Sequence, residues 1–286
     1  MNRFAIYSGS ILLTGIIFFS SCTERIDIEL DSTYTRLVVY SEITTENKHH
    51  TVKLSKTSDY FSNQEAPALT GALVEIIADT ANYEFKEEPK TPGLYISSLP
   101  FKGIPGVRYE LSIHNVDIDD NGEMESFTAL SVMPIPGNVD SISFNYFESP
   151  FINGYQVSMY AFDPPEKQWY IYKLTRNGQL LTDDLTELTG MSDDFYNGNY
   201  IFGLPVGFLS NEDSLERSVP GDTITFELNS ITSDYYEFIS SAQSEIFGSN
   251  PLFGGPPANV KTNLDNGALG IFTTIAITKT SRIIPE

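Results

Sequence analysis

Short runs in which apolar and polar residues alternate recur along the chain from residue 35 onward. Thr51-Val-Lys-Leu-Ser-Lys-Thr57 alternates cleanly, and similar runs occupy residues 35–43, 71–78, 83–86, 93–97, 107–113 and 125–132. Turn-forming Gly, Pro and Asn residues separate them. Because alternation places apolar side chains on one face of a strand, the pattern predicts about seven short strands. Their spacing predicts a two-sheet β-sandwich of immunoglobulin or fibronectin type over residues 34–133.

Two tyrosines occupy similar positions within these runs. Tyr95 follows Gly93-Leu and Tyr109 follows Gly106-Val-Arg, so each tyrosine comes just inside a strand after a tight turn. A β-sandwich commonly uses a tyrosine at such a position to fix a corner of the fold. We therefore expect both tyrosines to fix corners of the sandwich.

Pro134-Ile-Pro136-Gly137 interrupts the alternation. Two prolines and a glycine cannot continue a central strand, so we expect a linker over residues 134–140 and a second domain over residues 141–286. Strand patterns return at residues 141–147, 155–162, 169–175, 179–182, 200–202, 223–229 and 270–277. The predicted fold class is mainly β, with a sandwich followed by a second β-rich domain.

One helix is expected in the second domain, over residues 233–247. Thr232 or Ser233 can cap its start, and Gly248 follows its end. Apolar residues recur at helical spacing at Tyr235, Phe238, Ile239, Ala242, Ile246 and Phe247. We interpret them as the face that packs on a sheet rather than as a ligand site.

The first residues follow the pattern of an export signal. Arg3 precedes an apolar stretch over residues 4–19, and Ser20-Ser21 leads to Cys22, the sole cysteine of the 286-residue sequence. We expect residues 1–21 to be a signal peptide and Cys22 to become an acylated N-terminus that carries palmitate. The alternative is an ordinary signal peptide with an incidental cysteine. If Cys22 carries lipid, residues 22–33 form an acidic tether between the lipid and the first strand. The acidic residues favour a position at the cell surface over one that faces the periplasm.

The charge of the chain is strongly negative, with 38 acidic and 17 basic residues and a net charge of −21. This charge repels phosphate backbones, so we do not expect nucleic-acid binding. It favours solubility or a cationic partner. Since a lone cysteine cannot form an internal disulfide, the fold must depend on its apolar core.

Catalytic signatures are scarce, and we expect the protein not to be an enzyme. The sequence has no Gly-x-Ser-x-Gly elbow, no His-Glu-x-x-His, no Cys-x-x-Cys and no glycine-rich phosphate loop. Its three histidines are His49, His50 and His114. His49 and His50 fall between two strands, where we expect a solvated loop.

Asp117, Asp119 and Asn121 precede Gly122 in the spacing of the first half of a calcium loop. The twelfth position is Thr128, where a bidentate Glu is expected. The competing interpretation is a hairpin connection in which Asn121-Gly122 supplies the turn. We favour the turn, so calcium is a disfavoured cofactor.

Residues 182–208 show no clear period and mix acids with aromatics. Long loops of this kind are commonly functional, and the acids suit a cationic or hydroxyl-rich partner. A surface loop without a ligand remains the alternative. We expect the segment to lie outside the core and to contact a partner through Asp183, Asp184, Glu187, Asp193, Asp194, Phe195, Tyr196, Tyr200 and Phe202.

Several short motifs in order carry a resemblance to a known family. They are Leu37-Val-Val39, Gly71-Ala-Leu-Val74, Gly93-Leu-Tyr95, Pro105-Gly-Val-Arg-Tyr109, Asn250-Pro-Leu-Phe253 and Gly267-Ala-Leu-Gly-Ile-Phe272. The chain resembles the Bacteroidetes outer-membrane lipoprotein family called domain of unknown function 4249. Members often have an aromatic residue where this chain has Ile271.

The resemblance implies an outer-membrane lipoprotein encoded near a TonB-dependent barrel receptor, and it supplies no catalytic residues. We therefore expect a lipid-anchored binding or accessory protein that partners such a barrel in nutrient capture or uptake. The alternative is a structural subunit of an outer-membrane assembly without its own ligand.

Overall fold

The computed structural model describes residues 35–58, 65–79, 81–182, 185, 188–213, 216–247 and 260–286. Residues from Thr35 to Glu286 form one compact unit. The described part is mainly β, with two sheets and a single helix, which confirms the predicted fold class. The predicted signal peptide, Cys22 and the tether lie outside the described residues, as does the Asn250-Pro-Leu-Phe253 motif.

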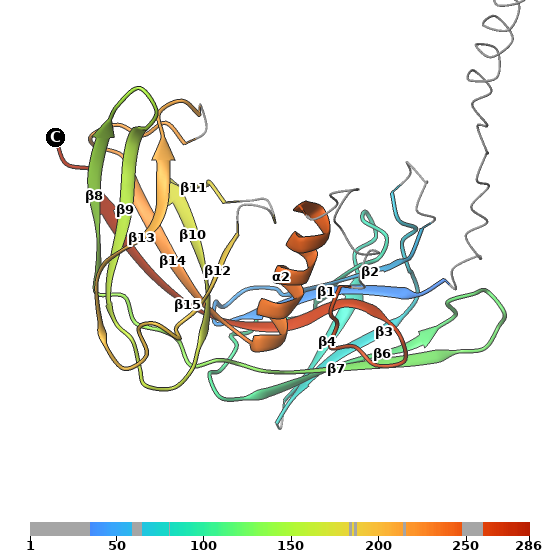
Figure 1. Ribbon diagram of the computed structural model, residues 1–286. Helices are drawn as coiled ribbons and strands as arrows, with labels where there is room; N and C mark the ends of the chain where they lie inside the picture. Colours follow the sequence, from blue (N-terminus) through green and yellow to red (C-terminus); the bar gives the residue numbers. More distant parts are fainter. Residues whose placement is uncertain are drawn as a thin grey trace, which may run out of the picture. The chain divides into compact units, whose positions relative to one another are not determined.

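Fifteen strands and one helix follow one another along the described chain (Figure 1). They are β1 (Leu37–Thr44), β2 (Thr51–Lys56), β3 (Leu73–Ala78), β4 (Ala81–Glu87), β5 (Leu94–Ser97), β6 (Arg108–Val116), β7 (Glu125–Val132), β8 (Ser141–Glu148), β9 (Asn153–Phe162), β10 (Trp169–Arg176), β11 (Gln179–Leu180), β12 (Thr189–Ser192), β13 (Tyr200–Ser210), β14 (Thr223–Ile231), α2 (Ser233–Phe247) and β15 (Leu269–Ile283).

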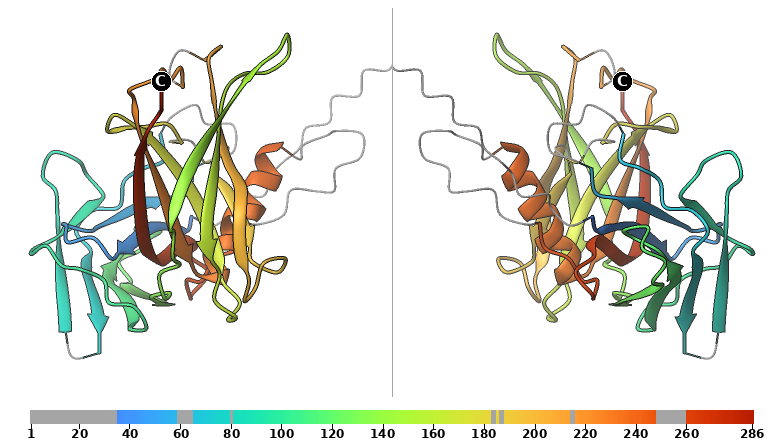
Figure 2. Two further views of the ribbon diagram at one scale, coloured as in Figure 1. Left: turned by 90° about the vertical axis from the view of Figure 1, so that its left-hand side faces the viewer. Right: turned by 90° about the vertical axis from the view of Figure 1, so that its right-hand side faces the viewer.

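Two sheets result from the pairing of these strands (Figures 1 and 2). The larger has the order β11-β10-β14-β15-β1-β2-β5-β4-β3-β6-β7, and β12 also pairs with β10. The smaller has the order β13-β9-β8. A single hydrogen-bonded sheet therefore runs through both halves of the described chain.

The first core is enclosed by strands β1 to β7 together with the start of β15. The sheet folds back, so that β7 returns to β15: Ser131 Oγ lies 2.9 Å from Thr274 Oγ1, and Ala129 forms an isolated bridge with Leu264. Tyr95 and Tyr109 are among its largest fully buried side chains. Both hydroxyls bond to backbone, which confirms the expected corners.

Strand β15 joins the two halves of the molecule. Its first part pairs in parallel with β1, and its second part pairs antiparallel with β14. Residues 271–276 are all buried because the strand is covered on both faces. Gly270 has φ +95°, and a Cβ there would lie 1.9 Å from Val39 O, so the position requires glycine.

The expected division into two domains at residues 134–140 stays a prediction. In the structure this segment is tied to the second half, because the Gly137 amide donates to Ser230 Oγ and Thr278 Oγ1 donates to the Gly137 carbonyl. The first core also includes Phe272 and Ala276 from the end of the chain. The two halves thus share β15 as a structural element.

The second core lies between the smaller sheet and strands β10 and β14. It contains Ile142 of β8, Val157 and Met159 of β9, Tyr172 of β10 and Phe226 of β14. Figure 1 shows β8, β9 and β13 lying across β10 and β14. The second half is therefore also built of two β layers.

Helix α2 confirms the sequence prediction in both its bounds and its cap. The Tyr235 amide donates to Thr232 Oγ1 at 3.2 Å, which satisfies one of the free amides of the first turn. Tyr235 and Ile239 pack with Ile171, Ile231 and residues of β15 in a third cluster. The helix packs on a sheet, as expected.

Residues 182–208 differ from the sequence prediction. Strand β12 pairs with β10, and β13 extends to Ser210 rather than ending at Phe202. Gly203, Pro205 and Gly207 interrupt the pattern of β13, and register shifts occur beside them. These residues normally mark loops or bulges, so a long strand was not predicted here.

Candidate functional site

The central part of the predicted contact segment, residues 182–208, is a turn between two strands. Residues 193–199 connect β12 to β13. The Asp193 carbonyl accepts the amides of Tyr196 (2.8 Å) and Asn197 (3.0 Å), which closes the turn. Since both flanking strands are paired with other strands, the turn has a fixed position on the second half of the molecule.

Asp193 anchors this turn to the start of β10. Its side chain is 2 % exposed, and Oδ2 accepts the Gln168 amide at 2.7 Å. The Asp193 amide donates in return to the Gln168 carbonyl at 3.3 Å. A carboxylate that accepts a buried amide forms one of the stronger protein hydrogen bonds. Asp193 is thus a structural residue, and the expectation that it contacts a partner directly does not match its burial.

Three aromatic side chains of the segment are exposed. Phe195 in the turn is 90 % exposed, Phe202 on β13 is 81 % exposed, and the rings of Tyr200 and Phe202 contact each other with centroids 4.5 Å apart. Phe162 of β9 is paired with Tyr200 and is also exposed. We call Phe162, Tyr200 and Phe202 the aromatic patch, and Phe195 lies in the turn that leads into β13.

Charged groups lie beside Phe195 on an exposed surface. Lys167 Nζ lies 2.7 Å from Asp194 Oδ1 and 5.6 Å from the ring centroid of Trp169. The hydrogen bond from Lys167 lowers the pKa of Asp194 below its ordinary value. Both side chains are exposed, so the pair adds little to stability. Asp194 is therefore accessible, as expected for a contact residue.

The expectation that residues 182–208 lie outside the core is wrong. Ile201 is buried in the second core, and Tyr196 packs against that core. The segment therefore contributes to the fold rather than lying outside it. Asp183, Asp184 and Glu187 lie outside the described residues.

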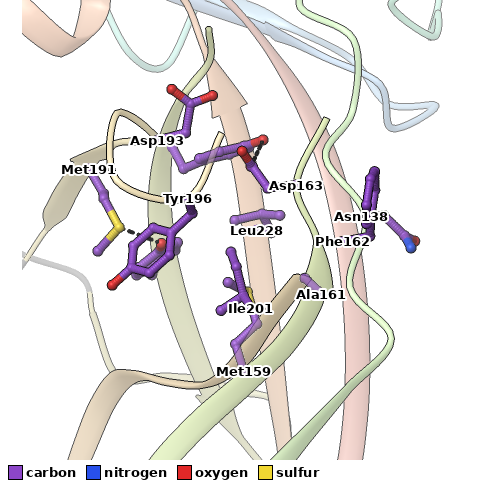
Figure 3. A pocket seen from close by; sticks show the side chains of 12 residues that line it. Asn138, Met159, Ala161, Phe162, Asp163, Met191, Asp193, Tyr196, Ile201 and Leu228 are labelled. Atoms are coloured by element: carbon purple, nitrogen blue, oxygen red, sulfur yellow. Dashed lines mark hydrogen bonds between the residues drawn. The ribbon is translucent and has the colours of Figure 1, made fainter. Parts of the chain in front are cut away.

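A small cavity of about 10 Å³ lies directly behind the turn. Figure 3 shows Asp163 and Asp193 at one end and the apolar side chains of Met159, Ile201 and Leu228 at the other. The Tyr170 hydroxyl bonds to Asp163 Oδ1 at 3.2 Å and also to Gln168 Oε1. The volume suits one water molecule and excludes an organic ligand.

The two aspartates of this cavity are incompletely paired. No described residue donates to Asp163 Oδ2 or Asp193 Oδ1, although both side chains are buried. Burial and, second, the negative charge of Asp193 raise the pKa of Asp163 above its ordinary value. Burial and the charge of Asp163 likewise raise the pKa of Tyr170. The arrangement therefore favours a proton retained on Asp163. Because the two aspartates lie beneath the turn, we assign them a structural role.

Sequence reasoning missed Asp163 and Gln168. The available signal was an acid placed directly after an alternating strand and before Pro164-Pro165. Proline pairs of this kind mark the end of a strand but do not show which groups the next strand brings near.

The predicted half calcium loop uses most of its oxygens within its own turn. Asp117 Oδ2 accepts the Gly122 amide at 3.0 Å, Asp119 Oδ2 accepts the Asn121 side-chain amide at 3.0 Å, and Asn121 Oδ1 accepts the Glu123 amide. Gly122 has φ +86°. Across the described ranges, no group of three or more His, Cys, Asp or Glu side chains is placed to hold a metal ion.

The expected solvated loop is right for His49, which is exposed, and wrong for His50. His50 is buried, its Nε2 lies 3.1 Å from the Phe101 carbonyl, and burial lowers its pKa to about 4. His49 Nδ1 lies 2.7 Å from the Ser97 carbonyl. Both imidazole rings therefore connect the start of β2 to the segment that begins at the end of β5.

Comparison with known proteins identifies the family to which this architecture corresponds. The model of the family described as domain of unknown function (DUF4249) matches residues 23–281. No curated protein matches the chain. In the part of the chain that the structure describes, no helix has the length and apolar character needed to cross a membrane.

Proposed function

The chain belongs to the DUF4249 family, and from that premise we propose that it is a lipid-anchored accessory protein that binds an outer-membrane barrel of the TonB-dependent class. The observation that carries the proposal is the aromatic patch, together with Phe195 in the turn that leads into β13. Phe195 and Phe202 are large apolar side chains with most of their surface in solvent. Exposed aromatic clusters on a soluble surface are typical of binding sites.

The way in which the patch is held supports a binding role. Asp193 fixes the turn through its buried carboxylate, and β13 is paired with β9 along its length. A preformed turn loses little conformational entropy when it binds, which increases affinity. The paired charges of Lys167 and Asp194 beside it would supply the polar rim that surrounds an apolar contact.

The anchor and the partner are parts of the same proposal. We propose that Cys22 carries the lipid and that the acidic residues after it lead to the folded body at the cell surface. The body would then reach a barrel in the same membrane and assist in nutrient capture. The strongly negative charge of the chain, −21, disfavours direct adhesion to anionic lipid and leaves a protein partner as the better explanation of the patch.

The test is co-purification of the full chain from detergent-solubilised outer membrane. We expect a TonB-dependent barrel in near-stoichiometric amount with the wild type, and at least a tenfold loss with the double variant Phe195→Ser/Phe202→Ser. Phe151→Ser is a matched control, because Phe151 is 92 % exposed but belongs to the β8–β9 hairpin. Absence of a barrel from the wild-type sample, or equal recovery with the double variant, would contradict the proposal.

A further inference from the structure

A second and larger cavity, of about 200 Å³, lies between the two β layers of the second half. Its described lining comes from β10, β12, β13 and the connections beside them: Tyr172, Leu174, Leu181, Thr182, Thr189, Val206, Gly207, Phe208, Leu209 and Glu216. We call this cavity the interlayer slot. It is separate from the aromatic patch and from the small cavity behind the turn, although Tyr172 lines both cavities.

The slot lies where β13, an edge strand of the smaller sheet, approaches β10 and β12 of the larger sheet without pairing with them. Strand β13 pairs with β9, and among the described residues it forms no ladder with β10, β11 or β12 of the larger sheet. A register shift between Pro205 and Gly207 bends β13 at this point. Figure 1 shows β13 in the layer that lies across β10 and β14.

Four of the side chains that line the slot are aliphatic, and they form its apolar part. Leu174, Leu181, Val206 and Leu209 are all buried and belong to the second core. In another protein, an apolar cavity of about 150 Å³ stays dry and binds benzene. The interlayer slot is larger, so a single aromatic ring or a branched aliphatic group fits, whereas a peptide segment or an oligosaccharide does not.

Polar groups line the slot as well, and they are mainly acceptors. Glu216 Oε2 accepts the Ser210 amide at 3.1 Å, which orients the carboxylate and leaves Oε1 able to accept a further hydrogen bond. Thr182 Oγ1 accepts the Leu174 amide at 3.3 Å, and Thr189 is exposed. One carboxylate beside an apolar slot, in a chain of net charge −21, attracts a cation rather than an anion.

We propose that the interlayer slot binds a small apolar amine, with its ring or branched chain among Leu174, Leu181 and Val206 and its ammonium group hydrogen-bonded to Glu216. The site is independent of the lipid anchor and of the barrel partner. Its test therefore uses the purified full chain alone and can fail without affecting the proposed function.

The experiment compares benzylamine with benzoate by isothermal titration calorimetry. The two probes carry the same ring with opposite charge, and we expect benzylamine to bind with a dissociation constant at least tenfold lower. Glu216→Gln should reduce this ratio below threefold. Thr189→Phe places a ring against the slot and should weaken benzylamine binding at least tenfold, whereas Thr51→Phe, at an exposed strand threonine far along the sheet, should not change it.

Methyl NMR of the wild type keeps the proposal falsifiable if a variant fails to fold. Benzylamine should shift the methyl signals of Leu181 and Val206 and leave those of Leu111 in the first core unchanged. Equal affinity for both probes, no binding of benzylamine at millimolar concentration, or shifts confined to other methyl groups would each overturn the proposal. The last outcome would show that the amine binds only to the acidic surface.

Discussion

The Tyr95→Phe substitution tests the corner that closes the first core. The Tyr95 hydroxyl accepts the Ala72 amide at 3.1 Å and donates to the Leu69 carbonyl at 3.1 Å, so one buried oxygen pairs two backbone groups that precede β3. Phenylalanine keeps the ring and its packing but leaves both backbone groups without this partner. The substitution therefore isolates the hydrogen bonds from the apolar burial.

The magnitude follows from the number of groups left unpaired. A buried polar group that loses its partner costs about 1–3 kcal/mol, so two such groups predict a loss of about 2–6 kcal/mol in the free energy of unfolding. Tyr109 offers an internal comparison, because its hydroxyl accepts a single amide, that of Ile104, at 2.8 Å. Tyr109→Phe should cost about half as much.

Urea unfolding followed by far-UV circular dichroism measures both effects. The slope of the free energy against urea should stay unchanged, since the surface exposed on unfolding is the same. Tyr146→Phe is the control, because the Tyr146 hydroxyl is bonded on an exposed surface and its loss should cost less than about 0.5 kcal/mol. If Tyr95→Phe is no more destabilising than Tyr146→Phe, the hydroxyl does not hold the corner and the reasoning is wrong.

Five further predictions concern the second half, the anchor and the half calcium loop. The raised pKa of Asp163 means that the native state retains its proton more strongly, so Asp163→Asn should gain stability relative to wild type as the pH rises above the ordinary aspartate value of about 3.9. Asp222→Asn should instead lose stability relative to wild type in the same melts as the pH rises toward that value from below, because the Val219 amide lowers the pKa of Asp222. Replacing residues 189–198 with a Gly/Ser linker should lower the melting temperature strongly, since β12 and the Asp193 bonds are lost; an unchanged melt would contradict the described pairing. Cys22→Ala should release the protein into the soluble fraction without label from palmitate, and membrane retention would refute the anchor. Chelation should leave the melting temperature unchanged, and a shift that disappears in Asp119→Ala would instead establish a calcium site.

Local patterns along the chain determined most of the elements. The alternation in residues such as Thr51–Lys56 identified the strands of the first half, and the spacing of Tyr235 and Ile239 after Thr232 identified the helix with its cap. The short motifs also predicted the family, and the family match covers residues 23–281. These features are local because backbone period, capping and turn chemistry depend on neighbouring residues.

Tertiary structure decided the features that depend on residues far apart. Strand β12 has little alternation of its own and exists because β10 presents an edge to it, and β13 remains a strand through Gly203, Pro205 and Gly207 because β9 pairs with it. His50 sits in a polar stretch of sequence, yet the fold buries it against Phe101.

The candidate site shows the same division. The sequence identified the exposed aromatics Phe195 and Phe202 by composition, but it could not separate them from Asp193, which is buried and structural. Nor could it place Asp163 beside Asp193, or show that a slot lies between β13 and strands β10 and β12. Burial and long-range pairing are properties of the assembled sheets, because the hydrophobic effect and strand pairing act between segments that the chain order leaves far apart.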